Sequence, residues 1–519
     1  MLRQTAAVIV SAFALAGRAL AVPAANPTAG DLREVDAATS TSLALGRTAQ
    51  ASPPGTAMRI AGLRDGDGRP LTFALEVGRL FSPDFKLYLD GRETPTDAPQ
   101  RLVYLHGTAE QWPGSSVAIS LDASTGAWNG TLVRADGVFA LGAPGEAAAL
   151  PLAAVAAVRP ADLTGVERGA VSDALEAAGV TGRRSAEAVA KRVIPAPGGI
   201  YGAALAIDTD HEFLGNGSVA EGETRVHDII AGVSELYERQ LGVPLAIRSL
   251  FLYPDEDDPW NAPNPHTGSE AEVLCEFGKF WQSHRPLAAY PRNAALFFTG
   301  KSSTEISGQA WLSSLCSFNA RPSACPPGGY GIVVRGRFVQ RDVLVTAHEL
   351  GHIFGSSHTH CYRPEIDQCW AEERGCYSGP VSAPTEGGSV MSYCNAANLS
   401  MGEPGLYGDR SERVIGVIRS LVDRVGPACL GRVNDPYALA AQPGDGEATL
   451  TWVDPFGNET NWLVEQLVKG KFKQIKSLPP NTTSITIGGL KAGEQTFRVR
   501  AKIKRDVSDY SASVNVTIP

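Results

Sequence analysis

The residues best suited to chemistry lie in one short segment, HELGHIFGSSH, at positions 348–358. His348 and His352 are four residues apart, so on a helix they lie on one face, one turn from each other. Gly355 follows three residues later and can adopt a left-handed conformation that ends the helix. Such a turn can bring His358 back to the first two histidines. The spacing therefore predicts three imidazoles around one metal ion.

Three neutral imidazoles would leave one corner of a tetrahedral Zn²⁺ open, as catalytic zinc sites require. Glu349, next to His348, can face that corner and hold the bound water, whose pKa zinc lowers toward about 7. The carboxylate can take a proton as the water attacks a polarised carbonyl, and then pass it to the leaving amine. His360 is expected outside the first set of ligands. The segment therefore predicts hydrolysis of peptide bonds, with Glu349 as general base.

The alternative is a run of histidines on the surface of a helix. Five positions of fixed type must match, namely the three histidines, the glutamate and the glycine. Chance gives such a match on the order of once in 10^5 chains of this length, so the metal site is strongly favoured.

Strands and helices alternate around the histidine segment. In the helix predicted over 338–355, Val343, Ala347, Leu350 and Phe354 form one apolar stripe that can pack on a sheet. The other expected elements are strands over 201–208, 243–253, 293–300 and 308–316 and helices over 223–242 and 269–284. This alternation predicts an α/β layer.

The length and composition indicate a folded protein of several domains. A chain of 519 residues suggests three or four domains, and 55 glycines with 35 prolines indicate many turns. The net charge of −9 argues against a dedicated nucleic-acid binder.

The N-terminus predicts export. Arg3 precedes an apolar stretch at 6–16 and the sequence Ala-Leu-Ala at 19–21, so residues 1–21 are predicted to be a signal peptide. A membrane anchor is the weaker alternative, because the run is about half of the roughly 20 residues that a span needs. No membrane span is predicted elsewhere, and a secreted, extracellular protein is expected.

Two regions flank the α/β layer. Residues 22–192 hold no cysteine and include a strand-like segment over 115–122 and a hairpin predicted over 130–142, around Ala135-Asp136-Gly137. Dibasic pairs at 183–184 and 191–192 suggest a linker that a protease could cut, although an ordinary charged helix fits these residues equally well. From 433 onward, short alternating strands predict an antiparallel sandwich, entered through a linker at 435–446.

The eight cysteines all lie between Cys275 and Cys429. An even number in an exported chain suggests disulfides, but eight cysteines allow 105 connectivities.

The histidine segment and the later SVMSY, residues 389–393, resemble a metzincin zinc endopeptidase. Met391 matches the methionine that lies in a tight turn beneath the zinc in that family. The segments YGAALAIDTDHEF, YERQLGVPLAI and GQAWLSSLC are similar to those of the adamalysin, or reprolysin, branch. The resemblance implies a catalytic domain over 193–430, with a mixed twisted sheet and a long active-site helix.

The flanking regions carry weaker resemblances. Residues 22–192, expected to be β-rich, are similar to a reprolysin propeptide. Residues 433–519 resemble a fibronectin type III domain, with Trp452 as the inner aromatic. Residues 1–274 contain no cysteine, so a pro-segment could not use a thiol to hold the zinc and would have to cover the cleft or offer another ligand.

The family resemblance also implies details of the site. Tyr393 could stabilise the oxyanion as in astacin-like and serralysin-like members. A tyrosine packed below the site fits equally well. An extended peptide substrate would pair with the edge strand over 308–316. By analogy with the family, Cys316 is expected to pair with Cys429.

Two further features allow weaker interpretations. The acidic segment 254–261 could bind Ca²⁺, although it lacks a spaced ligand pattern and a solvated loop is favoured. Lys469, Lys471 and Lys473 alternate along a predicted strand, so the C-terminal module could bind an anionic surface or polymer, although an ordinary solvent-facing strand is favoured.

Together the residues predict a secreted zinc metalloendopeptidase, made as a zymogen, with a fibronectin-like module. The alternative is a secreted binding or adhesion protein built on a catalytically weak metalloprotease-like scaffold.

Overall fold

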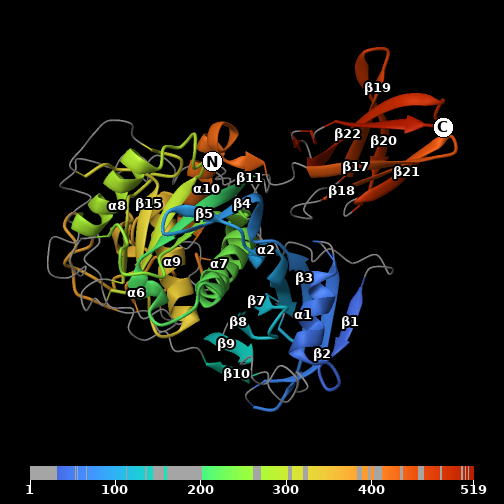
Figure 1. Cartoon of the computed structure of the whole chain (residues 1–519). Helices are drawn as coiled ribbons and strands as arrows, with labels where there is room; N and C mark the ends of the chain where they lie inside the picture. Colours follow the sequence, from blue (N-terminus) through green and yellow to red (C-terminus); the bar gives the residue numbers. More distant parts are fainter. Residues whose placement is uncertain are drawn as a thin grey trace, which may run out of the picture.

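In the computed structural model, a mixed central sheet runs through the largest lobe, on the left of Figure 1, and the histidine helix packs against it. In order across the sheet, its strands are β14 (Gly308–Ala310), β15 (Tyr330–Val334), β13 (Ala294–Thr299), β11 (Tyr201–Thr209), β12 (Leu245–Leu252), β4 (Phe81–Leu89) and β5 (Arg92–Thr94), with β16 (Gly431–Arg432) paired to β11. Neighbouring strands are parallel from β15 to β4, whereas β14 and β5 are antiparallel at the two ends. Every residue of β13 and β15 is buried, which explains their uninterrupted apolar sequences.

The structure describes residues 32–143, 157–160, 201–260, 271–301, 307–318, 325–382, 388–394, 399–402, 412–432, 437–453 and 461–519, apart from positions 53, 55, 66, 113, 135, 136, 480, 481, 504, 505, 509 and 512. The predicted signal peptide and both dibasic pairs lie outside the described residues.

The strand predicted over 308–316 is shorter than expected, because β14 ends at Ala310. The following residues turn instead, with positive φ at Ser313 and Cys316. Backbone amides of Ser313 and Leu315 donate to the carbonyl oxygens of His352 and Ile353. The prediction was wrong beyond Ala310 because these residues satisfy the free carbonyls at the end of the histidine helix.

Within the described residues, five α-helices surround the sheet: α6 (His211–Leu214), α7 (Val219–Leu241), α8 (Ala271–His284), α9 (Val339–Ile353) and α10 (Glu412–Cys429). Helix α7 begins earlier than the predicted residue 223, because Ser218 and Glu221 form a capping box. It ends at Gly242, which has a left-handed conformation, φ 64°.

Helices α7 and α9 pack closely where Gly232 meets Val343. A Cβ placed on Gly232 would lie 2.7 Å from Cγ2 of Val343. The absence of a side chain at Gly232 therefore sets how near the histidine helix comes to α7.

The N-terminal unit, residues 32–143 with β10, is built on a second sheet. Its strands in order are β1 (Arg33–Asp36), β2 (Ala57–Arg64), β3 (Pro70–Gly78), β6 (Leu102–Ala109), β7 (Ser116–Asp122), β8 (Trp128–Arg134), β9 (Gly137–Ala143) and β10 (Ala157–Pro160), and its helices are α1 (Ser42–Gln50) and α2 (Ala98–Arg101). The predicted hairpin corresponds to β8 paired with β9. Strands β4 and β5 leave this unit and join the central sheet beside β12. The division of the chain at residues 192 and 193 stays a prediction.

The C-terminal module is a sandwich of antiparallel sheets. One sheet holds β17 (Tyr437–Gly444), β18 (Glu447–Val453) and β21 (Ser484–Gly488), and the other holds β20 (Lys471–Leu478), β19 (Asn461–Val468), β22 (Gly493–Ile503), β23 (Asp506–Val507) and β24 (Val514–Ile518). Trp452 is buried between them, 5.6 Å from Trp462 between ring centroids. The linker predicted over 435–446 was wrong, because most of it forms β17 and pairs with β18.

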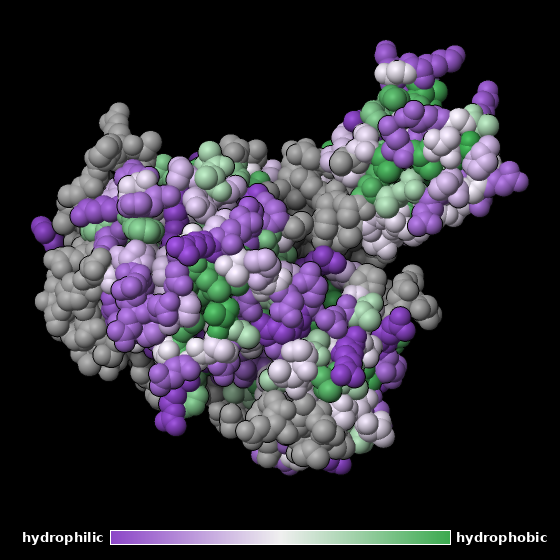
Figure 2. All heavy atoms as spheres, viewed as in Figure 1, coloured by the Kyte–Doolittle hydropathy of each residue, from purple (hydrophilic) through white to green (hydrophobic). Residues whose placement is uncertain are grey.

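All eight cysteines form disulfides: Cys275–Cys325, Cys316–Cys429, Cys361–Cys376 and Cys369–Cys394. The pairing of Cys316 with Cys429 is confirmed, and it ties the turn after β14 to the end of α10. On the face seen in Figure 2, the described residues are mostly hydrophilic, with smaller hydrophobic areas. Among the described helices, none combines the length and apolar composition that crossing a bilayer requires.

We predict that Gly232→Ala lowers the free energy of unfolding by about 1–2 kcal/mol. The new methyl group would overlap Val343, and overpacking of this kind outweighs the roughly 1 kcal/mol that alanine adds to helix stability. Thermal unfolding of the full chain measures the change. The double variant Gly232→Ala/Val343→Ala should lose less stability than the sum of the two single variants. Strict additivity would mean that the two side chains do not compete for the same space.

Candidate metal centre

Helix α9 and the turn after it bring together the three histidines of the motif. The Nε2 atom of His352 lies 3.1 Å from Nε2 of His348 and 3.1 Å from Nε2 of His358. Two nitrogens that bind one tetrahedral ion with bonds of 2.0–2.1 Å would be about 3.3 Å apart. His352 and His358 are buried, and His348 is half-buried. The arrangement has the size of a metal site.

The opposite nitrogen of each ring fixes its tautomer. Nδ1 faces the carbonyl oxygen of Val390 at 2.6 Å in His348 and that of Ser356 at 2.8 Å in His352. In His358 it faces Oε2 of Glu373 at 2.7 Å. Carbonyls, and an ionised carboxylate, have no proton to donate, so each Nδ1 must carry the hydrogen.

Each Nε2 therefore presents a lone pair toward the same point. Lone pairs at this spacing repel one another unless a cation lies between them. Burial lowers the pKa of His348 to about 3 and that of His352 well below its usual range, which keeps these imidazoles neutral. Neutral imidazoles are the metal-binding form, so the residues present fit a divalent transition-metal ion.

The turn that returns His358 to the site depends on Gly355, whose φ is 105°. Its amide donates to the carbonyl of His352, and the amide of Ser356 donates to that of Gly351. After this turn, the amide of Thr359 donates to the carbonyl of Met391 at 2.9 Å. The backbone thus holds His358 between the end of α9 and the segment that contains Met391.

Met391 supports the site from the side of α9. Its side chain is fully buried, and a Cβ on Gly351 would lie only 2.3 Å from its sulfur atom. Its neighbour Val390 supplies the carbonyl that orients His348. The methionine turn therefore packs against the helix between the two histidines and orients one of them.

Glu349 is buried on α9 beside the end strand β14. Among the described residues, its Oε2 has no hydrogen-bond partner, and burial raises its pKa well above the usual range. A Cβ on Gly308 would lie 2.6 Å from Oε1 of Glu349, so only a glycine lets β14 approach this closely. A buried carboxyl oxygen without a partner is costly in a packed interior and is typical of a group that meets water or substrate.

Tyr393 lies beside the histidines. Its ring centroid is 4.3 Å from that of His358 and 6.3 Å from that of His348. This position fits both roles considered for it, a hydroxyl near the reacting carbonyl and a ring that packs against a ligand.

The sequence analysis missed Glu373. One of its oxygens, Oε2, accepts from Nδ1 of His358 at 2.7 Å and from Nε2 of His360 at 2.8 Å. Burial raises the pKa of Glu373, but the two histidines outweigh burial and lower it. The disulfide Cys361–Cys376 closes the loop that holds this carboxylate. A single glutamate inside such a loop has no sequence pattern that would identify it.

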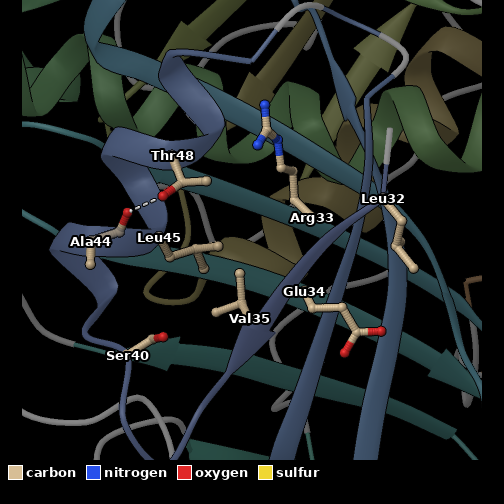
Figure 3. Close-up of a pocket in the computed structure, with 8 residues that line it drawn as sticks. All are labelled: Leu32, Arg33, Glu34, Val35, Ser40, Ala44, Leu45 and Thr48. Atoms are coloured by element: carbon tan, nitrogen blue, oxygen red, sulfur yellow. Dashed lines mark hydrogen bonds between the residues drawn. The ribbon is translucent and has the colours of Figure 1, made fainter. Parts of the chain in front are cut away.

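Two other features of the structure are not supported as metal sites. In the acidic segment 254–261, Asp258 accepts from the backbone amides of His211 and Trp260, both at 2.8 Å, which stabilises the loop without a cation. Figure 3 shows a surface hollow of the N-terminal unit between α1 and β1, where Thr48 donates to the carbonyl of Ala44. It is lined by Leu32, Arg33, Glu34, Val35, Ser40, Ala44, Leu45 and Thr48 and holds no group of metal ligands.

We predict that Glu373→Ala weakens metal binding by about 10- to 100-fold, because His358 loses the acceptor that fixes its tautomer. Glu373→Gln should weaken it less, since an amide oxygen can still accept one of the two bonds. Competition with a chromogenic chelator measures the affinity for Zn²⁺. The neighbouring Glu372 is exposed, and Glu372→Gln is the matched control. Unchanged affinity in Glu373→Ala would mean that the carboxylate does not position the ligand.

Comparison with known proteins agrees with this geometry over part of the chain. Residues 202–401 match the sequence model Reprolysin_5, metallo-peptidase family M12. No curated protein matches the chain.

Among solved structures, chains whose titles name FN3 proteins match 16–17% of this chain. "Structure of FN3tt mut" is 15% identical to this chain. The alignment covers 17% of this chain and 97% of that chain, with a TM-score of 0.15. "The crystal structure of a Fn3-like protein from Clostridium thermocellum" is 22% identical. The alignment covers 16% of this chain and 91% of that chain, with a TM-score of 0.15. TM-scores this low do not support a fold assignment, so the fibronectin-like assignment stays a prediction.

The family match contains the three converging histidines, the buried Glu349 and the methionine turn. It confirms the resemblance seen in HELGHIFGSSH and SVMSY. Residues 202–401 therefore form a reprolysin-like metzincin domain of the metallo-peptidase family M12.

Proposed function

We propose that the chain is a secreted endopeptidase that uses zinc bound by His348, His352 and His358. The observation that carries the proposal is the convergence of three Nε2 lone pairs beside a buried carboxyl oxygen without a partner. Three nitrogen ligands suit a catalytic zinc site with an open fourth position. When bound there, zinc would polarise a carbonyl and lower the pKa of water.

Glu349 is the general base in this proposal. In this proposal its ionised carboxylate, whose Oε2 lacks a hydrogen-bond partner among the described residues, takes a proton from the attacking water. The same group then gives the proton to the leaving amine, and no covalent intermediate with the protein is needed. The closeness of Glu349 to Gly308 of β14 supports a proton transfer next to the proposed substrate strand.

The substrate in this proposal is an extended protein or peptide segment. Strand β14 is the terminal strand of the central sheet and pairs antiparallel with β15. A peptide lying along β14 would form main-chain hydrogen bonds, as in recognition by strand addition. Because β14 has three residues, the few substrate residues that pair with it would position the scissile bond.

Secretion and a zymogen form complete the proposal. Four disulfides are consistent with an oxidising compartment. In the C-terminal module, Lys471 and Lys473 are exposed on β20, where they could contact an anionic surface or polymer.

A binding or adhesion protein on an inactive scaffold is the second candidate. It leaves the orphaned oxygen of Glu349 unexplained, because a scaffold has no use for a buried carboxyl group that lacks a partner. We therefore favour the enzyme.

We predict that Glu349→Gln keeps bound zinc and loses cleavage by at least about 10²-fold, since an amide cannot take the proton. Cleavage of a denatured protein, followed by mass spectrometry of the products, measures the loss, and a chelator should abolish activity in the unchanged chain. Glu212, exposed on α6, supplies the control Glu212→Gln. Full activity in Glu349→Gln would show that Glu349 is not the general base. Zinc binding without any cleavage in the unchanged chain would favour the adhesion protein.

We also predict that the secreted protein acquires a new N-terminus after Arg184 or Arg192, the ends of the two dibasic pairs. N-terminal sequencing of active enzyme from culture medium checks this. Active enzyme that starts only near Val22 would exclude processing at these pairs.

A further inference from the structure

The N-terminal unit shares a hydrophobic core with the metallopeptidase domain. Leu80, Leu87, Tyr104, Ala118 and Val138 are all buried in the same cluster as apolar residues of α7 and β12. This shared core resembles the inside of one domain more than the surface between two separable ones.

The central sheet is also shared. Strand β4 runs parallel to β12, with Leu87 opposite Leu250, and the amide of Asp90 donates to the carbonyl of Leu252 at 3.1 Å. Strand β12 has the sequence LAIRSLFL. Without β4 it would become an exposed and strongly apolar sheet edge, which natural proteins avoid.

A buried ionic group joins the two parts. Arg101 of the N-terminal unit forms ion pairs with Asp122 in its own unit and with Glu223 of α7, the latter at 2.7 Å. All three side chains are buried. Removing the arginine leaves two buried carboxylates without a cation, which is strongly unfavourable.

Other polar side chains of α7 also meet partners in the N-terminal unit. Ser120 Oγ lies 2.7 Å from Nδ1 of His227, and Asn129 donates to Asp228 at 2.7 Å. Ser116 donates to Glu235 at 3.0 Å. These matched groups specify how the unit docks along the helix.

The docked face lies away from the metal centre. Helix α7 packs against both β7 and α9 (Figure 1), and the N-terminal sheet touches the histidine helix near its start, where Gln340 donates to the carbonyl of Gly130 at 2.9 Å. Strands β4 and β5 lie at the opposite end of the central sheet from β14. The proposed substrate strand therefore does not require the described N-terminal residues to leave.

We propose that residues 32–143 are a permanent structural half of the peptidase, which stays docked on α7 and β12 after any cut between 161 and 200. Processing at the dibasic pairs would then yield two chains in one molecule and release neither.

The test uses the full, zinc-loaded chain with a specific protease site inserted between Arg184 and Ser185. After complete cleavage, both pieces should elute together in gel filtration at the mass of the uncut protein, and the N-terminal unit should unfold in the same thermal transition as the peptidase domain. Elution of a separate N-terminal piece, with the remainder still folded and monomeric, would overturn the proposal. The readout is mass, so it is independent of whether the protein cleaves peptides.

A variant and its control test whether Arg101 holds the two pieces together. Arg101→Ala should lower the midpoint of thermal unfolding by about 5–10 °C and allow the cut pieces to separate. Arg59→Ala removes ion pairs to Glu34 and Glu110 inside the N-terminal unit and should leave the pieces together. Separation in both variants, or in neither, would contradict the role given to Arg101.

Hydrogen exchange on the unmodified chain provides a second measurement that needs neither insertion nor substitution. Amides of β4 should be protected to the same degree as those of β11 and β12, because one cooperative unit contains all three strands. Exchange in β4 that is about 100-fold faster than in β11 would show that the N-terminal unit opens independently.

Discussion

Nε2 of His352 faces Nε2 of His348 and Nε2 of His358 at 3.1 Å each without a proton between them, and the rest of the domain is arranged to hold the three rings there. Each ring is turned by a hydrogen bond from its other nitrogen to an oxygen, supplied by the methionine turn, by the end of α9 or by Glu373. These oxygens come from parts of the chain far apart in sequence. The repulsion among the three nitrogen lone pairs is thus offset by the hydrogen bonds that orient the rings and by the cation that the site fits.

The close packing around α9 follows from the same constraint. Gly351 admits the sulfur of Met391, Gly232 admits Val343 of the helix, and Gly308 admits the carboxyl group of Glu349. At each of these positions a side chain would push apart two elements that meet at the metal centre. Small residues therefore set the distances on which the chemistry depends.

The N-terminal unit extends this scaffold on the side away from the metal. It covers the edge of β12 and one face of α7, and α7 in turn supports α9. The helix that carries two of the histidines is thus connected through α7 to residues that precede the peptidase domain in the sequence. This connection gives a structural reason for a long N-terminal region that does not involve the proposed cleft.

The sequence by itself determined the local features. Helical spacing placed His348 and His352 on one face, Gly355 marked the turn, and alternating apolar residues located most strands, since each of these patterns acts over a few residues. The tertiary structure alone decided that Glu373 holds His358, that β4 and β5 join the central sheet and that β14 stops at Ala310. These outcomes depend on which distant groups can satisfy a buried nitrogen, an open sheet edge or a free helix carbonyl, and no spacing along the chain encodes such a choice.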